Sequence, residues 1–182
     1  MIGKGISSCA PCDAPFFKDK KVAVVGGGDS AMEEALVLTK YAPEVTIIHR
    51  REEFKASVAM QEKVKANPKI KIMWNTEIVS VSGESKLESL ELKNNKTNET
   101  SVFPVDGLFI AIGHTPSTTV FSGKIDLDEK GYVVATDKTK TSVPGIFVAG
   151  DVEDHKYKQA ITAAGFGCMA GMDTLAYLEE SR

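Results

Sequence analysis

The chain has 182 residues, 42% hydrophobic and 26% charged, a composition typical of a soluble globular protein with one large or two small domains. Its formal net charge of −3 argues against a nucleic-acid-binding surface. No apolar run approaches the ~20 residues needed to cross a bilayer, which argues against a membrane protein.

The N-terminus and the cysteine content indicate the compartment. The N-terminal segment carries Lys4 but no long apolar stretch, so it does not have the pattern of a secretory signal. Three cysteines are also too few for a secreted scaffold held by disulfides. We therefore expect a cytoplasmic protein.

Two of the cysteines, Cys9 and Cys12, form a C-x-x-C pair near the N-terminus. Pro11 would lie in the first turn of a short helix that starts near Ser8, and the positive end of a helix stabilises a thiolate, the species that attacks disulfides. A zinc site would need two further ligands, and the chain has no second C-x-x-C and no H-x₃₋₅-H. The spacing favours a redox pair over zinc or inert cysteines, and it leaves open whether Asp13 participates or is merely solvated.

The next segment has the pattern of a strand, a glycine turn and a helix. Val22–Val25 is a continuous apolar run, as expected of a parallel strand buried on both faces. The G-x-G-x-x-G/A spacing that follows gives a tight turn, close backbone approach to a pyrophosphate, and close packing of helix on strand. We therefore predict a dinucleotide site at the helix N-terminus, with Asp29 or Ser30 as the cap, formed by Gly26, Gly27, Gly28, Asp29, Ser30 and Ala31.

A second strand, Val45–Ile48, ends in basic residues. His49, Arg50 and Arg51 stand roughly 20 residues beyond the glycines, where an NAD-binding domain places an acid for the ribose 2′-hydroxyl. Arginine at this place favours a 2′-phosphate instead, and Lys55 adds a further positive charge. The sequence therefore predicts a preference for NADP over NAD.

The rest of the first domain alternates helix and strand signals. A helix is expected over Glu52–Asn67, ended by Pro68. A small antiparallel excursion and a last apolar strand that closes the parallel sheet should follow. The expected strands are Ile70–Trp74, Glu77–Val81, Leu87–Lys93, Ser101–Val105 and Gly107–Gly113.

The chain changes character after Gly113. A polar linker with a proline begins at His114, which places a domain boundary between residues 1–113 and 114–182. The second part should contain strands over Tyr132–Ala135 and Ile146–Ala149. A helix is expected over Gln159–Glu179.

The first half of that helix is rich in alanine and glycine. Glycine is unfavourable inside a helix unless something must approach the backbone closely, so we expect a tightly packed neighbour. Cys168 on this helix is expected to be a small buried apolar residue.

Six segments together resemble the low-molecular-weight thioredoxin reductases, members of the pyridine nucleotide-disulfide oxidoreductase group. The resemblance covers essentially the whole chain, and the order and spacing of the segments make chance very unlikely. The segments are Cys9–Asp13 (CAPCD, where the family usually has CATCD), Val22–Ala31, His49–Ala56, Ala111–Pro116, Gly145–Asp151 and Gln159–Gly165.

The resemblance implies an α/β fold: a Rossmann-like NADPH-binding domain with a parallel sheet and a small antiparallel excursion, followed by the C-terminal part of an FAD-binding domain. It also implies that electrons pass from NADPH to FAD, then to the dithiol, and then to thioredoxin. The implied roles are the redox dithiol for Cys9 and Cys12, acid/base chemistry for Asp13, a 2′-phosphate clamp for Arg50, Arg51 and Lys55, and flavin contacts for Asp151, Lys158, Gln159 and Ala160, in addition to cofactor positions at His49, Gly113 and Gly150.

Three departures from the family pattern bear on function. Pro11 replaces a threonine, and lysines at Lys55 and Lys158 stand where arginines are usual, which keeps the charge but loses the planar fork. The family also carries roughly a hundred earlier residues with a glycine turn for the FAD pyrophosphate, and this sequence starts just before the dithiol. We therefore expect the chain alone to bind NADPH and to hold FAD poorly.

Two functional hypotheses follow, with no metal in either. The first is an NADPH-dependent thioredoxin-disulfide reductase, present as a partial chain, acting on thioredoxin or a similar small dithiol protein, and completed by a homodimer or by the missing FAD-domain segment. The second is a non-catalytic NADPH-binding module that acts through an interaction surface. The C-x-x-C pair does not identify the electron acceptor, because recognition lies in surface that the sequence does not reveal.

Overall fold

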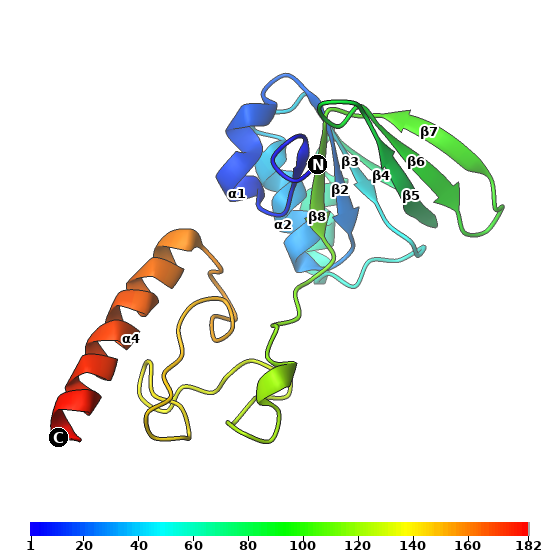
Figure 1. Cartoon of the computed structure of the whole chain (residues 1–182). Helices are drawn as coiled ribbons and strands as arrows, with labels where there is room; N and C mark the ends of the chain where they lie inside the picture. The colour runs from blue at the N-terminus through cyan, green and yellow to red at the C-terminus, as the bar shows by residue number, and fades with distance from the viewer. Residues whose placement is uncertain (182) are drawn as a thin grey trace. The chain divides into compact units, whose positions relative to one another are not determined.

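The computed structural model describes residues 1–181, and Figure 1 labels most of the helices and strands. The chain divides into two compact units, of which the first ends at Gly113 and the second begins at His114. The two units are described separately.

The first unit is built on a five-stranded parallel sheet with the order β1-β8-β2-β3-β4. In the centre of this sheet, Val24 lies opposite both Ile47 and Phe109. The strands are β1 (Ile6–Ser7), β2 (Lys21–Gly26), β3 (Glu44–Ile48), β4 (Ile70–Met73) and β8 (Gly107–Ala111).

Both faces of this sheet are covered, which explains the continuous apolar runs in its strands. Successive side chains of a strand point to opposite faces. Val24 packs with the helices, in one buried cluster with Met32 of α2 (Asp29–Leu38), whereas Ala23 packs in a second cluster with Leu90 of β6 (Ser89–Asn94). The helices of this unit are α1 (Ala10–Asp13), the 3-10 turn η1 (Ala14–Phe17), α2 (Asp29–Leu38) and α3 (Val58–Lys65).

The second cluster is closed by a three-stranded antiparallel sheet with the order β5-β6-β7. Its strands are β5 (Thr76–Ser82), β6 (Ser89–Asn94) and β7 (Thr100–Pro104), close to the predicted excursion. The mixed α/β architecture with a parallel sheet and a small antiparallel sheet confirms the fold class expected from the sequence.

The helix predicted over Glu52–Asn67 is shorter in the structure. It begins only at Val58, and the residues before it form a loop. The backbone N–H groups of Lys55 and Ala56 donate to the carbonyl oxygen of Gly27, at 2.8 and 3.1 Å. These tertiary hydrogen bonds hold the loop against the glycine turn, so the helical pattern of the sequence is overridden there.

The sequence predicted that the last strand of the first unit closes the parallel sheet at its edge. The structure shows that it does not. Strand β8 lies inside the sheet because β1 pairs with its outer edge, with Ile6 opposite Leu108. A strand of two residues has too few positions to show an alternating pattern, and the sequence analysis missed it.

The second unit contains the 3-10 turn η2 (Thr119–Phe121) and the helix α4 (Ala160–Glu180). The strands predicted over Tyr132–Ala135 and Ile146–Ala149 are wrong for the described chain. Each segment makes only isolated bridges, Leu127 with Val133 and Lys140 with Phe147. A strand needs a partner along its length, and these segments find only a single paired residue each.

The C-terminal helix was predicted correctly, but its surroundings were not. None of its described residues is buried, and a Cβ atom added to Gly165, Gly167 or Gly171 would meet nothing within 4 Å. Cys168 is exposed and carries a free thiol rather than being buried. Among residues 1–181, these three glycines therefore have no close neighbour, whereas Ala163 in the first turn of the helix faces Gly150. No helix in that range is long and apolar enough to cross a membrane.

Candidate functional site

A cleft of about 780 Å³ opens at the carboxyl ends of the parallel strands in the first unit. Ligands of open α/β sheets bind at this edge, where the chain leaves neighbouring strands in opposite directions. The cleft is lined by residues at the ends of β2, β3 and β8 and by one side of β5: Val25, Gly26, Gly27, Gly28, Ser30, His49, Arg50, Arg51, Lys55, Thr76, Glu77, Ile78, Ile110, Ile112 and Gly113.

The three glycines of the turn have different surroundings. Gly26 has φ of 153°, and a Cβ atom there would lie 2.3 Å from the carbonyl oxygen of Ala111 and 2.9 Å from the Cβ of Ala31. Gly26 and Ala31 therefore serve the close contact of helix and sheet. Around Gly28, by contrast, a Cβ atom would meet nothing within 4 Å. Nothing in the protein requires a glycine there, so the open space suits a ligand that approaches the backbone.

Gly28, rather than Asp29 or Ser30, is the N-cap of α2, and no side chain caps this helix end. Asp29 is instead used elsewhere: its Oδ1 accepts hydrogen bonds from the backbone N–H of Ser57 at 2.9 Å and from the Ser57 hydroxyl at 2.8 Å. These two hydrogen bonds lower the pKa of the Asp29 carboxyl. The helix end that faces the cleft is left to an anion, and a pyrophosphate fits it.

The middle glycine and the histidine after β3 pack against each other. A Cβ atom on Gly27 would lie 2.1 Å from Cε1 of His49. The His49 ring is 7% exposed, lies beside Phe54 and Trp74, and donates from Nε2 to the carbonyl oxygen of Glu53 at 2.9 Å. Both residues line the cleft, and their contact shapes its floor.

The remaining basic residues extend the cleft into a second recess of about 540 Å³. Arg50, Arg51 and Lys55 are exposed, and none of their charged groups forms an ion pair with a described residue. Glu52 also lines the recess but is paired with Lys96, whose hydrogen bond lowers the pKa of the Glu52 carboxyl. Three cations available to a ligand form a site that fits a phosphate.

The two N-terminal cysteines are bonded to each other in a disulfide. Cys9 and Cys12 have an S–S distance of 1.99 Å and lie on α1, with Cys9 at its N-cap and Pro11 in its first turn, as predicted. Cys12 is exposed and Cys9 is half-buried. Asp13 is the last residue of the same short helix, and its role in the chemistry stays a prediction.

A carboxylate that the sequence analysis missed lies behind the disulfide. Glu34 on α2 accepts a hydrogen bond at 2.6 Å from the backbone N–H of Ala10, one of the two residues between the cysteines. Burial raises the pKa of Glu34, although the hydrogen bond from Ala10 opposes that effect. This bond ties the disulfide turn to the helix that begins at the glycine turn.

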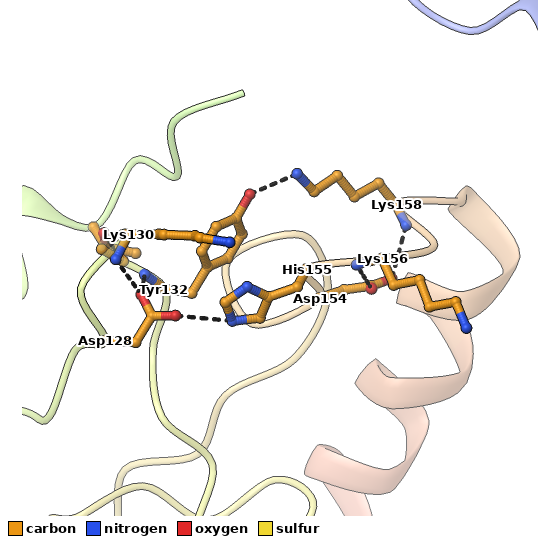
Figure 2. A network of polar contacts seen from close by, with 9 residues as sticks. Asp128, Lys130, Tyr132, Asp154, His155, Lys156 and Lys158 are labelled. Atoms are coloured by element: carbon orange, nitrogen blue, oxygen red, sulfur yellow. Dashed lines mark hydrogen bonds and ion pairs between the residues drawn. The ribbon is translucent and has the colours of Figure 1, made fainter. Parts of the chain in front are cut away.

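In the second unit, a network of polar contacts orders the segment before α4 (Figure 2). Asp154 is buried, and its carboxylate accepts the backbone N–H groups of Lys156, Tyr157 and Lys158, each at 2.8 Å. Burial acts to raise the pKa of Asp154, but these hydrogen bonds outweigh it and lower the pKa. Lys158, with φ of 48°, then donates from Nζ to the Tyr132 hydroxyl at 2.5 Å.

A second carboxylate completes this network. Asp128 contacts Nε2 of His155 at 3.1 Å, and the His155 ring lies 4.1 Å from the ring of Tyr132 (Figure 2). The network therefore connects the chain around Tyr132 to the start of α4.

The predicted flavin contacts of the second unit gather near the N-terminus of α4. Gln159 is the N-cap, with a capping box, and a Cβ atom on Gly150 would lie 3.5 Å from the Cβ of Ala163 in the first turn. Asp151 and Ala160 are exposed. Their role as flavin contacts stays a prediction.

No three His, Cys, Asp or Glu side chains among the described residues lie close enough together to hold a metal ion.

One protein family matches the part of the chain that contains both the cleft and the disulfide. The profile of the pyridine nucleotide-disulphide oxidoreductase family matches residues 2–167. The chain belongs to this family.

Several relatives of this chain are thioredoxin reductases. The thioredoxin reductase of Streptomyces clavuligerus is 53% identical over 179 residues, which are 98% of this chain and 56% of the relative. Thioredoxin reductase 1, mitochondrial, of Arabidopsis thaliana is 54% identical over 183 residues, 97% of this chain and 49% of the relative. Our chain thus spans about half the length of these family members.

A solved structure in the family has the same fold. The thioredoxin reductase of Streptococcus pyogenes MGAS5005 superposes with a TM-score of 0.89 at 38% identity, over 97% of this chain and 58% of that one.

Sequence analysis identified the residues on the parallel strands but missed those that come from other elements. Thr76, Glu77 and Ile78 of β5 form a wall of the cleft, and Asn75 and Lys96 line the recess. They carry no motif, and only the packing of the antiparallel sheet on the parallel one brings them there.

Proposed function

We propose that this chain is the nucleotide-binding and dithiol part of an NADPH-dependent thioredoxin reductase. The proposal depends on one compact unit that holds both a disulfide and a cleft, in which the glycine turn is followed by three cations without an ion-pair partner among residues 1–181. The matched family takes its name from the pyridine nucleotide and the disulphide.

In this proposal the cleft binds the nucleotide in two places. The pyrophosphate lies over Gly28 at the uncapped end of α2, where backbone N–H groups and the helix dipole favour an anion. The 2′-phosphate lies among Arg50, Arg51 and Lys55, whose donors suit its oxygens. NADH lacks that phosphate, so the second place selects NADPH.

The dithiol carries two electrons to the acceptor. Once Cys9 and Cys12 are reduced, the thiolate of one attacks the acceptor disulfide and forms a mixed disulfide, releasing one acceptor thiolate. The other cysteine then attacks the sulfur of its partner, which restores the Cys9–Cys12 bond and releases the second acceptor thiolate. Asp13 exchanges the protons, and thioredoxin or a similar small dithiol protein is the acceptor.

FAD, when bound, supplies the transfer of electrons from the nicotinamide to the disulfide. Asp151, Lys158, Gln159 and Ala160 would hold it, beside the Gly150 turn. These residues supply one side of a flavin site, so we propose that the chain alone binds NADPH and holds FAD weakly. A homodimer or an additional FAD-domain segment would complete the enzyme, in the cytoplasm, where thiols are kept reduced.

The test is calorimetric titration of the chain with NADPH and NADH. We expect NADPH to bind at least about tenfold more tightly, because charge-assisted hydrogen bonds to the phosphate each contribute about 1.5–3 kcal/mol. Arg51→Ala should weaken NADPH binding and leave NADH binding unchanged. Lys63→Ala, an exposed cation on α3 outside the cleft, is the matched control. Equal affinity for the two nucleotides would contradict the proposal.

A second candidate is a non-catalytic NADPH-binding module. The long helix α4, with none of its described residues buried, favours this reading because it offers a surface for another protein. An absorbance spectrum with added FAD separates the two candidates. A flavin band that NADPH bleaches, followed by reduction of a disulfide reagent in wild type but not in Cys12→Ser, supports the enzyme; NADPH binding without either supports the module.

A further inference from the structure

The turn between β6 and β7 reaches the loop that carries the two arginines of the recess. Asn94 orders this turn: its side-chain Oδ1 accepts the backbone N–H groups of Lys96 at 2.9 Å and Thr97 at 3.1 Å, and its carbonyl oxygen accepts that of Asn98 at 2.8 Å. These hydrogen bonds order the turn from within. It belongs to the antiparallel sheet, about 45 residues along the chain from the arginines.

Asn95, at the tip of this turn, contacts the loop that carries Arg50 and Arg51. One contact is direct, and a second runs through Asn75. Its side-chain Nδ2 donates to the carbonyl oxygen of Arg50 at 3.2 Å, and its backbone N–H donates to the carbonyl oxygen of Asn75 at 2.6 Å. The backbone N–H of Asn75 in turn donates to the carbonyl oxygen of Arg51 at 3.2 Å. Both arginine carbonyls are thus held, one by Asn95 itself and one through Asn75.

Asn75 suits this position because its φ is 52°, in the left-handed region that asparagine tolerates better than most residues. The next residue of the turn, Lys96, pairs with Glu52, which directly follows the arginines. Both partners are more than half exposed, so this ion pair adds little by itself. The side-chain hydrogen bond of Asn95, which is also exposed, is the contact that reaches the backbone of an arginine directly.

Neither arginine has an ion-pair partner among the described residues. The position of each guanidinium group therefore depends on the backbone that carries it. A planar fork binds a phosphate well only when its direction is right, and a loop ordered in advance loses less entropy on binding. The contacts of Asn95 supply that order.

We propose that Asn95 is a positioning residue for the 2′-phosphate site, and that it sets the preference for 2′-phosphorylated over unphosphorylated nucleotides through the backbone of Arg50 and Arg51. The proposal rests on the proposed function, since it takes this recess as the 2′-phosphate site.

The experiment measures the dissociation constants of NADPH and NADH by calorimetry for wild type, Asn95→Ala and Asn98→Gly. We expect Asn95→Ala to raise the NADPH constant about three- to tenfold, with the NADH constant unchanged. Asn98→Gly is the matched control: Asn98 lies in the same turn with φ of 61°, which glycine also adopts. It should leave both constants unchanged.

A second readout needs no nucleotide. Amide hydrogen exchange across residues 50–55 should be faster in Asn95→Ala than in wild type or Asn98→Gly, at equal melting temperature. If wild type prefers NADPH but Asn95→Ala keeps the same preference and the same exchange rate, Asn95 is not a positioning residue. The proposed function is unaffected by that outcome. If wild type shows no preference, both are overturned.

Discussion

The two units of this chain differ in how far they bury their apolar residues. In the first unit the parallel sheet is covered on both faces, and residues such as Val24 and Phe109 have no exposed surface. In the second unit the buried cluster consists of Ile125, Val133 and Val148. Helix α4 keeps none of its described residues buried, and Ile161, for example, is 80% exposed.

This difference shows that a helix or strand pattern and a place in a core are separate properties. The apolar residues on α4 are as numerous as those of a buried helix, yet large side chains along its length are exposed, including Ile161, Met172, Leu175 and Leu178. An exposed apolar surface of this kind marks an interface with another part or another chain. The candidate site, by contrast, rests on the well-packed unit.

The largest test of this comparison replaces one apolar side chain in each unit. Phe109→Ala should lower the free energy of unfolding by about 3–5 kcal/mol, because it leaves a cavity between the sheet and the helices. Leu175→Ala on α4, where the side chain is 64% exposed, should change it by less than about 0.5 kcal/mol. Urea unfolding followed by fluorescence and circular dichroism measures both. Similar losses would mean that α4 is packed after all.

Replacing one glycine in each unit tests the same difference in packing. Gly27→Ala should destabilise the first unit by about 1–3 kcal/mol, because the new methyl group would overlap the His49 ring. Gly171→Ala should stabilise α4 by up to about 1 kcal/mol, because it adds a helix former in open space. Thermal unfolding followed at a helix-sensitive wavelength gives both values. A destabilising Gly171→Ala would reveal a neighbour at the small-residue face.

The smallest effects concern single carboxyl groups in the first unit, whose pKa values shift in opposite directions. The hydrogen bonds from Ser57 lower the pKa of Asp29, so its contribution to stability is present above the usual aspartate range and disappears as the pH falls through the lowered pKa. Asp29→Asn should therefore reduce the melting temperature at neutral pH, and the difference from wild type should vanish in strong acid.

Burial raises the pKa of Glu34, which reverses the sign. The contribution of Glu34 is fully present below the usual glutamate range and is lost as the pH rises through the raised pKa. Glu34→Gln keeps an acceptor for the Ala10 N–H but does not titrate, so the melting temperature of this variant should rise relative to wild type as the pH increases above the usual glutamate range. The same melting series measures it, and a gain in the acid direction would contradict the assignment.

The sequence predicted the elements whose signal is local. The strand over Val22–Val25, the glycine turn and the helix after it were recognisable, because apolar runs and glycines act within a few residues. The elements that failed depend on distant partners. The loop before α3 is held by the Gly27 carbonyl, and the segments around Tyr132 and Ile146 lack a long pairing partner.

For the site, the sequence by itself determined which residue types are present: a C-x-x-C pair, a glycine turn and a basic strand end in the spacing of a nucleotide-dependent reductase. The contacts that hold these residues in place are seen only in the tertiary structure. Glu34 reaches Ala10 across 24 residues, and Asn95 reaches Arg50 across 45. Such contacts leave no periodic pattern, because a hydrogen bond between distant residues depends on how whole sheets and helices pack, and local spacing does not encode that packing.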